Sequence, residues 1–556
     1  MAFDEDQQKE KLDQLQQKEE EDLAQLLAKK YKIPYLNLGR AFIDLDALKL
    51  IPKDRAEAAG LAVVQSTGKK LQIAVKNPTL DKVKEIVTEL HRDGYQPQLF
   101  LVSMRSLKHA WARYEEAGEE SASITNVIDI SKDKIVEFRR EIKTTKDFER
   151  MLGEKILQGK TQRVTDLLDY VLGGAFELVV SDIHVEPAED KVHMRVRLDG
   201  MLQDIANFSH DMHKMLLVRI KLVCELKLNI HDRSQDGRFT IRVGDADVEV
   251  RVSTLPGPYG ESIVMRILHP SAIETSFEDL GMHPILQELI EREIQKPNGM
   301  IITTGPTGSG KTTTLYAFIK KLNEPGVKII TIEDPIEYHI AGITQTQTNK
   351  EAGYTFETGL SAIVRQDPDI ILVGEMRNRE TAEIGMQAAL TGHLVFSTLH
   401  TNNAPGTIPR LIDLGVPPNI IAPAINLAIA QRLVRILCPH CKKQVPPTPE
   451  QTATIKKFVE TLPEKYTRPS LDNFSLHTPG GCGECNFTGY KGRIAVFEAF
   501  LIDDEMERLI LKNPSEAIVR EAALKQGMVT LEQDGILKLL SGTTSWDELN
   551  RIVGLI

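Results

Sequence analysis

The sequence predicts a multidomain α/β protein. Its 556 residues correspond to about three or four domains of roughly 150 residues each. One stretch combines an apolar strand, a glycine-rich loop and an amphipathic helix, and two other stretches combine short strands with helices. Apolar residues make up 41% of the chain, and the chain also contains 37 glycines. This composition suits a globular protein with several hydrophobic cores.

The composition argues against several classes of protein. Met1 is followed by Asp4, Glu5 and Asp6, which does not fit a secretory signal peptide. No stretch reaches the ~18 consecutive apolar residues of a membrane-spanning helix. The 68 basic and 79 acidic side chains give a net charge of −11, which opposes a surface built to neutralise nucleic-acid phosphates. We therefore expect a soluble, cytoplasmic chain.

The sequence predicts an interaction region in the N-terminal part of the chain. Residues 1–30 carry leucines at three- and four-residue spacing among charged side chains, which is typical of a solvated helix. Residues 31–114 predict a compact α+β domain without any catalytic spacing, and we interpret it as an interaction domain. Residues 115–160 are charged and weakly periodic, so we expect a linker with some helix there.

Residues 161–280 predict a second α+β domain with an arginine-rich sheet face. Four apolar side chains alternate with one histidine and two arginines between Lys191 and Leu198, as in a half-buried strand. The stretches 239–243 and 248–252 alternate in the same way. For any single arginine, ordinary solvated charge explains the pattern equally well. Four more arginines lie in or near these strands: Arg238, Arg242, Arg251 and Arg266.

The strongest motif is a phosphate-binding loop. An apolar strand at 299–304 runs into Gly305-Pro-Thr-Gly-Ser-Gly-Lys-Thr312, a complete GxxxxGK[ST] match, and an amphipathic helix follows. Glycines let the backbone wrap phosphates so that its N–H groups point inward. We expect Lys311 to neutralise the β- and γ-phosphates and the Thr312 hydroxyl to bind Mg²⁺. The expected nucleotide-binding residues are Gly305, Pro306, Thr307, Gly308, Ser309, Gly310, Lys311, Thr312 and Thr313.

Three further strands, at 327–332, 369–373 and 394–398, follow the phosphate loop in the sequence. Carboxylates come directly after two of them, in the segment Glu333–Glu337 and at Glu375. Open α/β sheets bind ligands at the carboxyl ends of their strands. Hydrolysis needs carboxylates to orient or deprotonate water and to hold a metal ion, often through water. We therefore expect the catalytic site at these strand ends.

Four of the five cysteines form two CxxC pairs. Cys438 and Cys441 are separated by 40 residues from Cys482 and Cys485, which is typical of a tetrahedral four-thiolate zinc site. Unpaired thiols in a reducing cytoplasm are the alternative. Because four protein ligands complete the coordination of zinc, we expect a structural ion. Beyond the second pair, helices are predicted over 516–525 and 531–540.

Four segments of this chain together resemble the type II/type IV secretion ATPase family, most closely its pilus-extension (assembly) and type II secretion members. Gly305–Thr312, Ile332–Glu337, Asp367–Glu375 and Gly392–Thr401 are similar to its Walker A, Asp, Walker B and His boxes. Upstream, Ser181–Pro187, Gln235–Arg238 and Arg251–Pro256 resemble its second N-terminal domain. The resemblance covers the chain from about residue 31 to its end.

The resemblance implies a domain order. A RecA-like P-loop ATPase domain would occupy 281–435, preceded by the two α+β domains, of which the second, 161–280, would be PAS-like. A zinc-binding insertion would occupy 436–495. Pilus-extension and secretion members carry such an element, and retraction members generally lack it. A helical C-terminal region would occupy 496–556.

The resemblance also implies roles for side chains. Glu337 would be the general base for the attacking water, and Glu375 would act on Mg²⁺ through water. Arg238 and Arg251 would reach the phosphates from the second N-terminal domain. The expected catalytic set is Glu337, Glu375, Lys311, Arg238, Arg251, His393 and His400.

Three of these positions need comment. His393 and His400 flank a strand, where isolated histidines are more often structural, but as His-box residues they would report the nucleotide state across a subunit contact. Asn378 stands where the family usually has Asp. Because the primary carboxylates are intact, we expect this change to affect a subunit contact or the rate rather than to abolish hydrolysis.

The implied function is a homohexameric, Mg²⁺-dependent ATPase that powers type IV pilus assembly or type II secretion through an inner-membrane platform protein. We expect it in the cytoplasm, peripheral at the inner face of the membrane, with membrane association only through partners and no direct contact with nucleic acid. A RecA-like nucleic-acid motor of competence or conjugation is the alternative, since a local basic channel is compatible with the net charge. A nucleotide-dependent assembly protein that hydrolyses little is a third reading, and the intact carboxylates argue against it.

Overall fold

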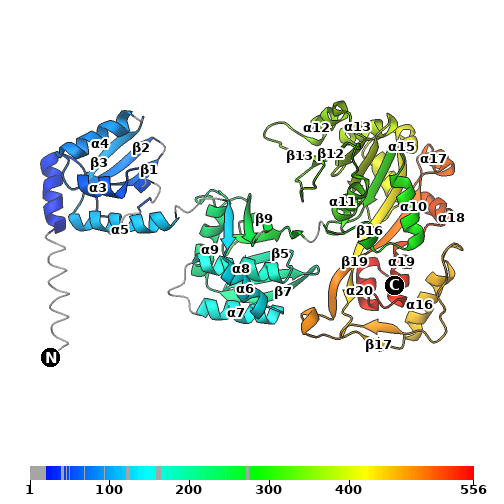
Figure 1. Ribbon diagram of the computed structural model, residues 1–556. Helices are drawn as coiled ribbons and strands as arrows, with labels where there is room; N and C mark the ends of the chain where they lie inside the picture. The colour runs from blue at the N-terminus through cyan, green and yellow to red at the C-terminus, as the bar shows by residue number, and fades with distance from the viewer. Residues whose placement is uncertain are drawn as a thin grey trace. The chain divides into compact units, whose positions relative to one another are not determined.

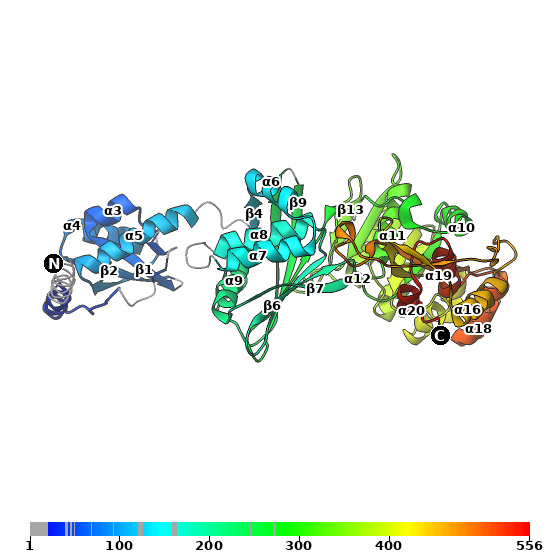
Figure 2. The same cartoon turned by 90° about the horizontal axis from the view of Figure 1, so that it is seen from below.

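The computed structural model describes residues 20–555 apart from 39–42, 45–46, 49, 68, 93, 121–125, 158–163, 245 and 271–273. The chain divides into two compact units, Met1–Val127 and Ile128–Ile556 (Figures 1 and 2). Both are mixed α/β, and together they contain several sheets. Within the described ranges, no helix is long and apolar enough to cross a bilayer.

The first unit is built on a three-stranded sheet of order β1-β2-β3. β1 and β2 are antiparallel, and β2 and β3 are parallel. A helix over residues 20–31 lies against the unit, where Glu21 accepts a hydrogen bond from the Ser103 hydroxyl at 2.6 Å. The rest of the expected N-terminal helix, 1–19, lies outside the described residues. The elements are α3 (Lys53–Ala59), β1 (Leu61–Thr67), β2 (Lys70–Val75), α4 (Asp81–Arg92), β3 (Gln96–Leu101) and α5 (Met104–Glu120).

The second unit begins with a seven-stranded sheet of order β4-β8-β9-β10-β5-β6-β7. Helices α6 to α9 cover one of its faces (Figures 1 and 2). The predicted alternation is confirmed in β6, where every second side chain from Val192 to Leu198 is buried. The strands are β4 (Val127–Ile130), β5 (Asp182–Pro187), β6 (Val192–Leu198), β7 (Met201–Phe208), β8 (Gln235–Val243), β9 (Ala246–Leu255) and β10 (Ser262–Ile267). The helices are α6 (Lys132–Glu141), α7 (Thr145–Leu157), α8 (Val164–Glu177) and α9 (His210–Val223).

Residues 128–157 fall in the stretch that the sequence assigns to a linker, but they form β4, α6 and α7 and belong to the core of this sheet. Phe138 is 2% exposed and Phe148 is 0% exposed. Gly173 and Gly174 of α8 make room for these rings, because a Cβ atom there would lie 2.0 and 2.2 Å from ring carbons. The many charged residues of this stretch occupy the outer faces of short helices, which gives the sequence its linker-like composition.

A second seven-stranded sheet, of order β13-β12-β14-β15-β11-β16-β19, carries the phosphate loop. Its strands are parallel except that β19 runs antiparallel to β16. Met300 and Ile302 of β11 face one core and Ile301 faces another, so the sheet is buried on both faces, as parallel sheets are. The strands are β11 (Gly299–Thr304), β12 (Ile329–Glu333), β13 (Thr344–Gln347), β14 (Ile370–Val373), β15 (Leu394–Leu399), β16 (Ile425–Leu437) and β19 (Tyr490–Leu501).

Helices pack on both faces of this sheet (Figure 1). α10 and α11 contribute to the core on one face, and α12, α13 and α15 to the core on the other. The predicted strands that follow the phosphate loop are confirmed as neighbours within one parallel sheet. The helices are α10 (Pro284–Ile294), α11 (Lys311–Leu322), α12 (Phe356–Ile363), α13 (Arg379–Leu390), α14 (Thr407–Asp413) and α15 (Pro418–Ala424).

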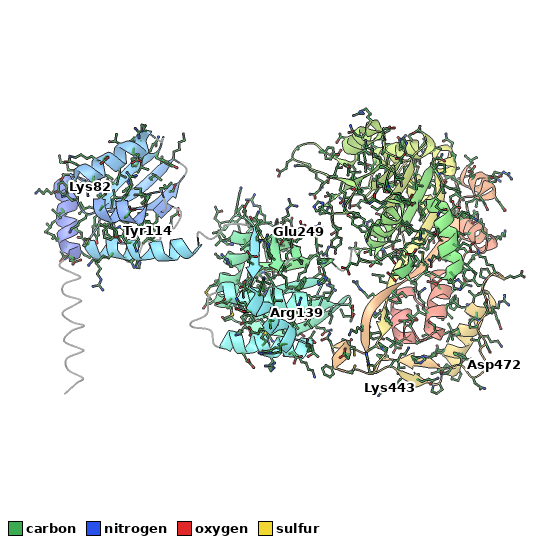
Figure 3. All side chains as sticks on the ribbon, in the orientation of Figure 1. Lys82, Tyr114, Arg139, Glu249, Lys443 and Asp472 are labelled. Carbon is green, nitrogen blue, oxygen red and sulfur yellow. The ribbon has the colours of Figure 1, made fainter. Side chains whose placement is uncertain are left out.

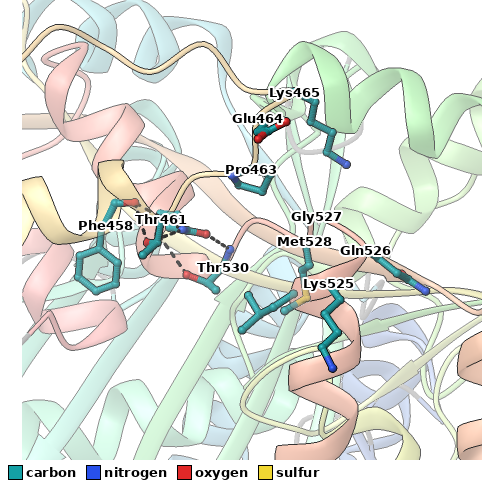
Figure 4. A pocket seen from close by; sticks show the side chains of 12 residues that line it. Phe458, Thr461, Pro463, Glu464, Lys465, Lys525, Gln526, Gly527, Met528 and Thr530 are labelled. Atoms are coloured by element: carbon teal, nitrogen blue, oxygen red, sulfur yellow. Dashed lines mark hydrogen bonds between the residues drawn. The ribbon is translucent and has the colours of Figure 1, made fainter.

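The four cysteines lie in an insertion between the paired strands β16 and β19. The insertion contains β17 (Lys443–Val445), α16 (Pro449–Glu460) and β18 (Leu476–Thr478). Helices α17 (Asp504–Ile510), α18 (Glu516–Lys525), α19 (Leu531–Leu540) and α20 (Trp546–Val553) follow β19, and the two predicted C-terminal helices are confirmed as α18 and α19. A cavity of about 620 Å³ lies between the end of α16 and the loop from α18 to α19, near Lys465 and Gly527 (Figure 4).

Candidate active site and metal centre

The phosphate loop connects β11 to α11 and depends on its glycines. Gly305, Gly308 and Gly310 have φ angles of 150°, 79° and 86°, which favour glycine. At Gly305 a Cβ atom would lie 2.6 Å from the carbonyl oxygen of Gln431 on β16. Any side chain at this position would therefore push the loop away from the neighbouring strand.

Two groups of the loop are suited to an anion. The Lys311 ammonium donates to the backbone carbonyl oxygens of Gly305 and Pro306 at 2.9 and 3.0 Å, and its burial lowers the pKa of Lys311. The buried Ser309 hydroxyl oxygen has no hydrogen-bond partner among the described residues. Phosphate oxygens would be better partners for Lys311 than backbone carbonyls are and would stabilise its charge. The loop therefore fits the phosphates of a nucleotide.

A cavity of about 730 Å³ opens over the loop, a volume in the range of small-molecule sites. It is bounded by residues Thr307–Thr313, by the ends of β12, β14 and β15, and by side chains from the first seven-stranded sheet. The expected site residues that line it are Thr307, Gly308, Ser309, Gly310, Lys311, Thr312, Thr313, Arg251, Glu337, Glu375 and His400.

Arg251 and Glu337 meet at one wall of this cavity. The Arg251 guanidinium lies 2.8 Å from Oε2 of Glu337 and also donates to the backbone carbonyl of Ile336. Its Nε donates to Glu249 at 3.0 Å, and Glu249 is labelled on the side-chain view (Figure 3). These contacts hold the Arg251 guanidinium directly against Glu337, the expected base. The sequence assigned Arg251 to the site only by resemblance.

Glu375 lies just beyond the end of β14 among basic side chains. The Arg377 guanidinium donates to Oε1 of Glu375, and Nε2 of His400 lies 3.6 Å from Oε2. Arg377 also lies 3.6 Å from Asp334. Asp334, Glu337 and Glu375 thus line one cavity together with Thr312, a set of oxygen donors that suits Mg²⁺ held partly through water. Asp334 and Arg377 were not among the expected site residues.

The arginines of the first seven-stranded sheet form a row across three strands. Arg238 of β8 pairs in register with Arg251 of β9, and Arg251 pairs with Arg266 of β10. Arg266 lines the cavity and donates to Asp182 at 3.0 Å, whose charge raises the pKa of Arg266 against the effect of burial. The side chain of Arg238 is 67% exposed and lies 3.8 Å from Glu249, outside the cavity lining.

The structure brings one of the two histidines to the cavity. His400 follows β15 and lines it. His393 precedes the same strand, and its Nδ1 contacts the carbonyl oxygen of Ala388 at 2.9 Å. A six-residue strand spans roughly 20 Å, so the two histidines that flank it lie at opposite ends of the strand.

Arg266 was named in the sequence but was not assigned to the site. Its register with Arg251 is the signal that would have found it.

The four cysteines form a compact cluster. Their ligand atoms all lie within 4.8 Å of one another, with Sγ–Sγ distances of 3.9 Å for Cys438–Cys482 and 3.7 Å for Cys441–Cys485. Thiolates about 2.3 Å from a tetrahedral Zn²⁺ are separated by about 3.8 Å. The backbone N–H of Gly481 donates to Cys441 at 3.1 Å and lowers the pKa of this thiol to about 7. The cluster is consistent with zinc.

Comparison with known proteins places the chain in a family. The sequence profile of the type II/IV secretion system proteins matches residues 158–551. The chain belongs to this family. It is 36% identical over 537 residues to the type IV pilus assembly ATPase PilB of Myxococcus xanthus (strain DK1622), covering 96% of this chain and 91% of that protein. It is 43% identical over 386 residues to the type II secretion system protein E of Pectobacterium carotovorum, covering 69% and 75%.

A solved structure supports the fold of the family. The X-ray structure of the Legionella pneumophila ATPase DotB superposes with a TM-score of 0.50 at 22% identity, covering 69% of this chain and 95% of that one. At this identity the likeness concerns the fold.

Proposed function

We propose that this family member is a homohexameric, Mg²⁺-dependent ATPase that powers type IV pilus assembly or type II protein secretion through an inner-membrane platform protein. The observation that carries the proposal is one cavity lined by Lys311, Glu337, Glu375 and Arg251. The names of the Myxococcus and Pectobacterium relatives support pilus assembly and type II secretion as the two machines.

The residues of the cavity divide the work of hydrolysis. Lys311 and the loop N–H groups bind the phosphates, and Thr312 and Glu375 would hold Mg²⁺, Glu375 through water. When bound, Mg²⁺ neutralises charge that develops on the phosphates. Glu337 orients the attacking water and takes its proton. His400 lies beside Glu375 and responds to whether nucleotide is bound. His393 lies outside the cavity lining, so its role in reporting the nucleotide state is exerted away from the cavity.

Arg251 links nucleotide binding to the base. In the present arrangement it is paired with Glu337 at 2.8 Å. Phosphate oxygens attract a guanidinium at least as strongly as a carboxylate does, so a bound nucleotide draws Arg251 away and leaves Glu337 free for water. The sheet that carries Arg251 then closes on the phosphate loop, with Arg238 joining from the same row. Repeated closing and opening around a hexamer would move the platform protein.

The four-cysteine insertion serves this motor as a structural zinc element. It lies between two strands that pair along the sheet, so a bound ion would fix the insertion without reaching the nucleotide cavity. We place the motor in the cytoplasm at the inner face of the membrane, where it is held by its partners. The N-terminal domain, 31–114, supplies an interaction surface.

Lys311→Ala tests the proposal at two levels. The purified variant should lose ATP hydrolysis, since the loop loses the cation that would neutralise the phosphates. In host cells this allele should remove surface filaments, which electron microscopy would reveal, if the machine is a pilus, or abolish export of secreted proteins if it is type II secretion. Normal hydrolysis by the variant would contradict the ATPase site. Hydrolysis stimulated by DNA at moderate salt would instead support the nucleic-acid motor.

A further inference from the structure

Tyr316 occupies a central position that none of the expected roles uses. It lies on α11, the helix that begins at Lys311, and is 3% exposed, yet it contributes to the lining of the nucleotide cavity. Thr312 and Tyr316 are four residues apart, so they lie one above the other on one face of the helix. A phosphate-site residue and Tyr316 are therefore carried by the same rigid element.

The Tyr316 hydroxyl contacts the start of the segment that carries Glu337. It donates to Oε2 of Glu333, the last residue of β12. Glu337 and Tyr338 line the same cavity as Tyr316 and Glu333. Burial, with the adjacent Glu333 carboxylate, raises the pKa of Tyr316. The hydroxyl therefore stays neutral and acts as a hydrogen-bonding group, and not as an acid or base.

Glu333 is an anchor for this contact. It is 3% exposed, and its other oxygen accepts hydrogen bonds from the Thr331 hydroxyl at 2.6 Å and from the Gln345 amide at 3.2 Å. Gln345 also donates to the backbone carbonyl of Tyr338 at 2.9 Å. With both oxygens engaged in the protein, Glu333 is fixed in place, unlike Glu337, whose carboxylate faces the cavity and Arg251.

We propose that Tyr316 is a positioning residue for hydrolysis: by anchoring Glu333, which Gln345 links to the carbonyl of Tyr338, its hydroxyl fixes the segment that carries Glu337 at a set distance from the phosphate loop. This inference rests on the proposed function, in which Glu337 is the base. Arg251 contacts the Glu337 side chain, whereas Tyr316 acts on the backbone of this segment through Glu333. Because a displacement of about 1 Å can cost about 100-fold in rate, loss of the Tyr316–Glu333 hydrogen bond at the start of this segment is enough to slow hydrolysis.

Tyr316→Phe tests the proposal in the full-length protein, because it removes the hydroxyl and keeps the ring in the core. We expect kcat for ATP hydrolysis to fall by about 10- to 100-fold, while KM for ATP and Kd for ADP change by less than about threefold. Tyr354→Phe is the matched control. Its hydroxyl donates to Thr346 at 3.1 Å outside the cavity lining, and we expect wild-type kcat.

The Glu337→Gln background separates positioning from general damage. If Tyr316 acts through Glu337, then the Tyr316→Phe, Glu337→Gln double variant should be no more than about threefold slower than Glu337→Gln alone. Glu333→Gln is a second probe of the same contact and should give the same pattern as Tyr316→Phe, including unchanged ADP affinity.

Several results would overturn the proposal. Wild-type kcat in both Tyr316→Phe and Glu333→Gln would remove it, and so would equal losses of kcat and ADP affinity, or a full further loss in the double variant. Wild-type turnover by Glu337→Gln would remove the base itself and with it this part of the proposed function. Slow Glu337→Gln with wild-type kcat in both Tyr316→Phe and Glu333→Gln would remove only the positioning role.

Discussion

The Arg251 guanidinium and the Glu337 carboxylate lie 2.8 Å apart, although 86 positions separate them in the sequence. The pair joins a strand of the first seven-stranded sheet to the loop that follows β12 of the second. Both side chains are only partly exposed, at 20% and 31%, so water weakens but does not abolish their attraction. The arginine is thus positioned to respond to whatever enters the cavity.

Arg251→Ala should lower turnover by about 100-fold, because it removes a cation that stabilises the charge of the transition state. Arg251→Lys should not restore it, since a lysine cannot contact Glu337, Glu249 and the Ile336 carbonyl together. Steady-state ATP hydrolysis measures both. Arg242→Ala is the control: its side chain is 45% exposed and pairs with Asp247 at 2.8 Å outside the cavity lining, and it should hydrolyse ATP within about twofold of wild type.

Cys482→Ser should reduce bound zinc and lower the Tm of the second unit, because a four-thiolate site loses much of its affinity with one ligand. Metal analysis of the purified protein should find one zinc ion per chain in the wild type and a clear deficit in the variant. Cys224→Ala alters a buried cysteine outside the four-cysteine cluster and should keep the full zinc content. Equal zinc in Cys482→Ser and wild type would contradict the metal centre.

The sequence predicted the parts of the fold that depend on local pattern. The strand at 299–304 and the two C-terminal helices agree with the structure to the residue, because local apolar patterns mark them. Local sequence pattern could not predict the row Arg238–Arg251–Arg266. It depends on the register of three strands that are distant in sequence.

Two other differences have the same cause. Phe138 and Phe148 pack into spaces left by Gly173 and Gly174. This packing involves more than one helix, so the sequence of a single helix does not predict it. His393 and His400 look equivalent in the sequence, but the strand between them carries one to the cavity and the other to the opposite edge. Local sequence patterns predict single helices and strands, whereas the residues of a site are brought together by the pairing and packing of these elements.

Glu498 should make the stability of the second unit depend on pH. Burial raises the pKa of Glu498 from its ordinary value near 4.5 to about 6, although the backbone N–H groups of Ala404 and Leu531 favour its charge. The folded state therefore holds this proton more tightly than the unfolded state. The contribution is fully present below about pH 4.5 and is lost as the pH rises through 6, by about 2 kcal/mol in all.

Glu498→Gln should remove this part of the pH dependence, since an amide does not titrate. The Tm of the variant relative to wild type should therefore rise by several degrees between pH 4.5 and pH 7, as followed by calorimetry. Glu505→Gln, on the exposed side of α17, should show no such change relative to wild type. A constant Tm difference between Glu498→Gln and wild type would show that this carboxyl titrates normally.

Asn378→Asp should leave turnover within about twofold of wild type. Asn378 is the N-cap of α13, and its side chain accepts a hydrogen bond from the backbone N–H of Thr381 at 3.0 Å. Asn and Asp are almost equally good N-caps, and the added charge of Asp gains only about 0.3–1 kcal/mol from the helix dipole. The cap is therefore kept whether an amide or a carboxylate stands at this position.

Asn378→Ala separates the cap from the charge. It removes the acceptor, and we expect a loss of about 1 kcal/mol in stability without a matching loss of kcat, because Asn378 does not line the cavity. Thermal unfolding and steady-state hydrolysis of the three proteins give the comparison. If Asn378→Asp instead changed turnover many-fold while its Tm stayed the same, the charge at this position would act on a neighbouring subunit and the cap would not account for the substitution.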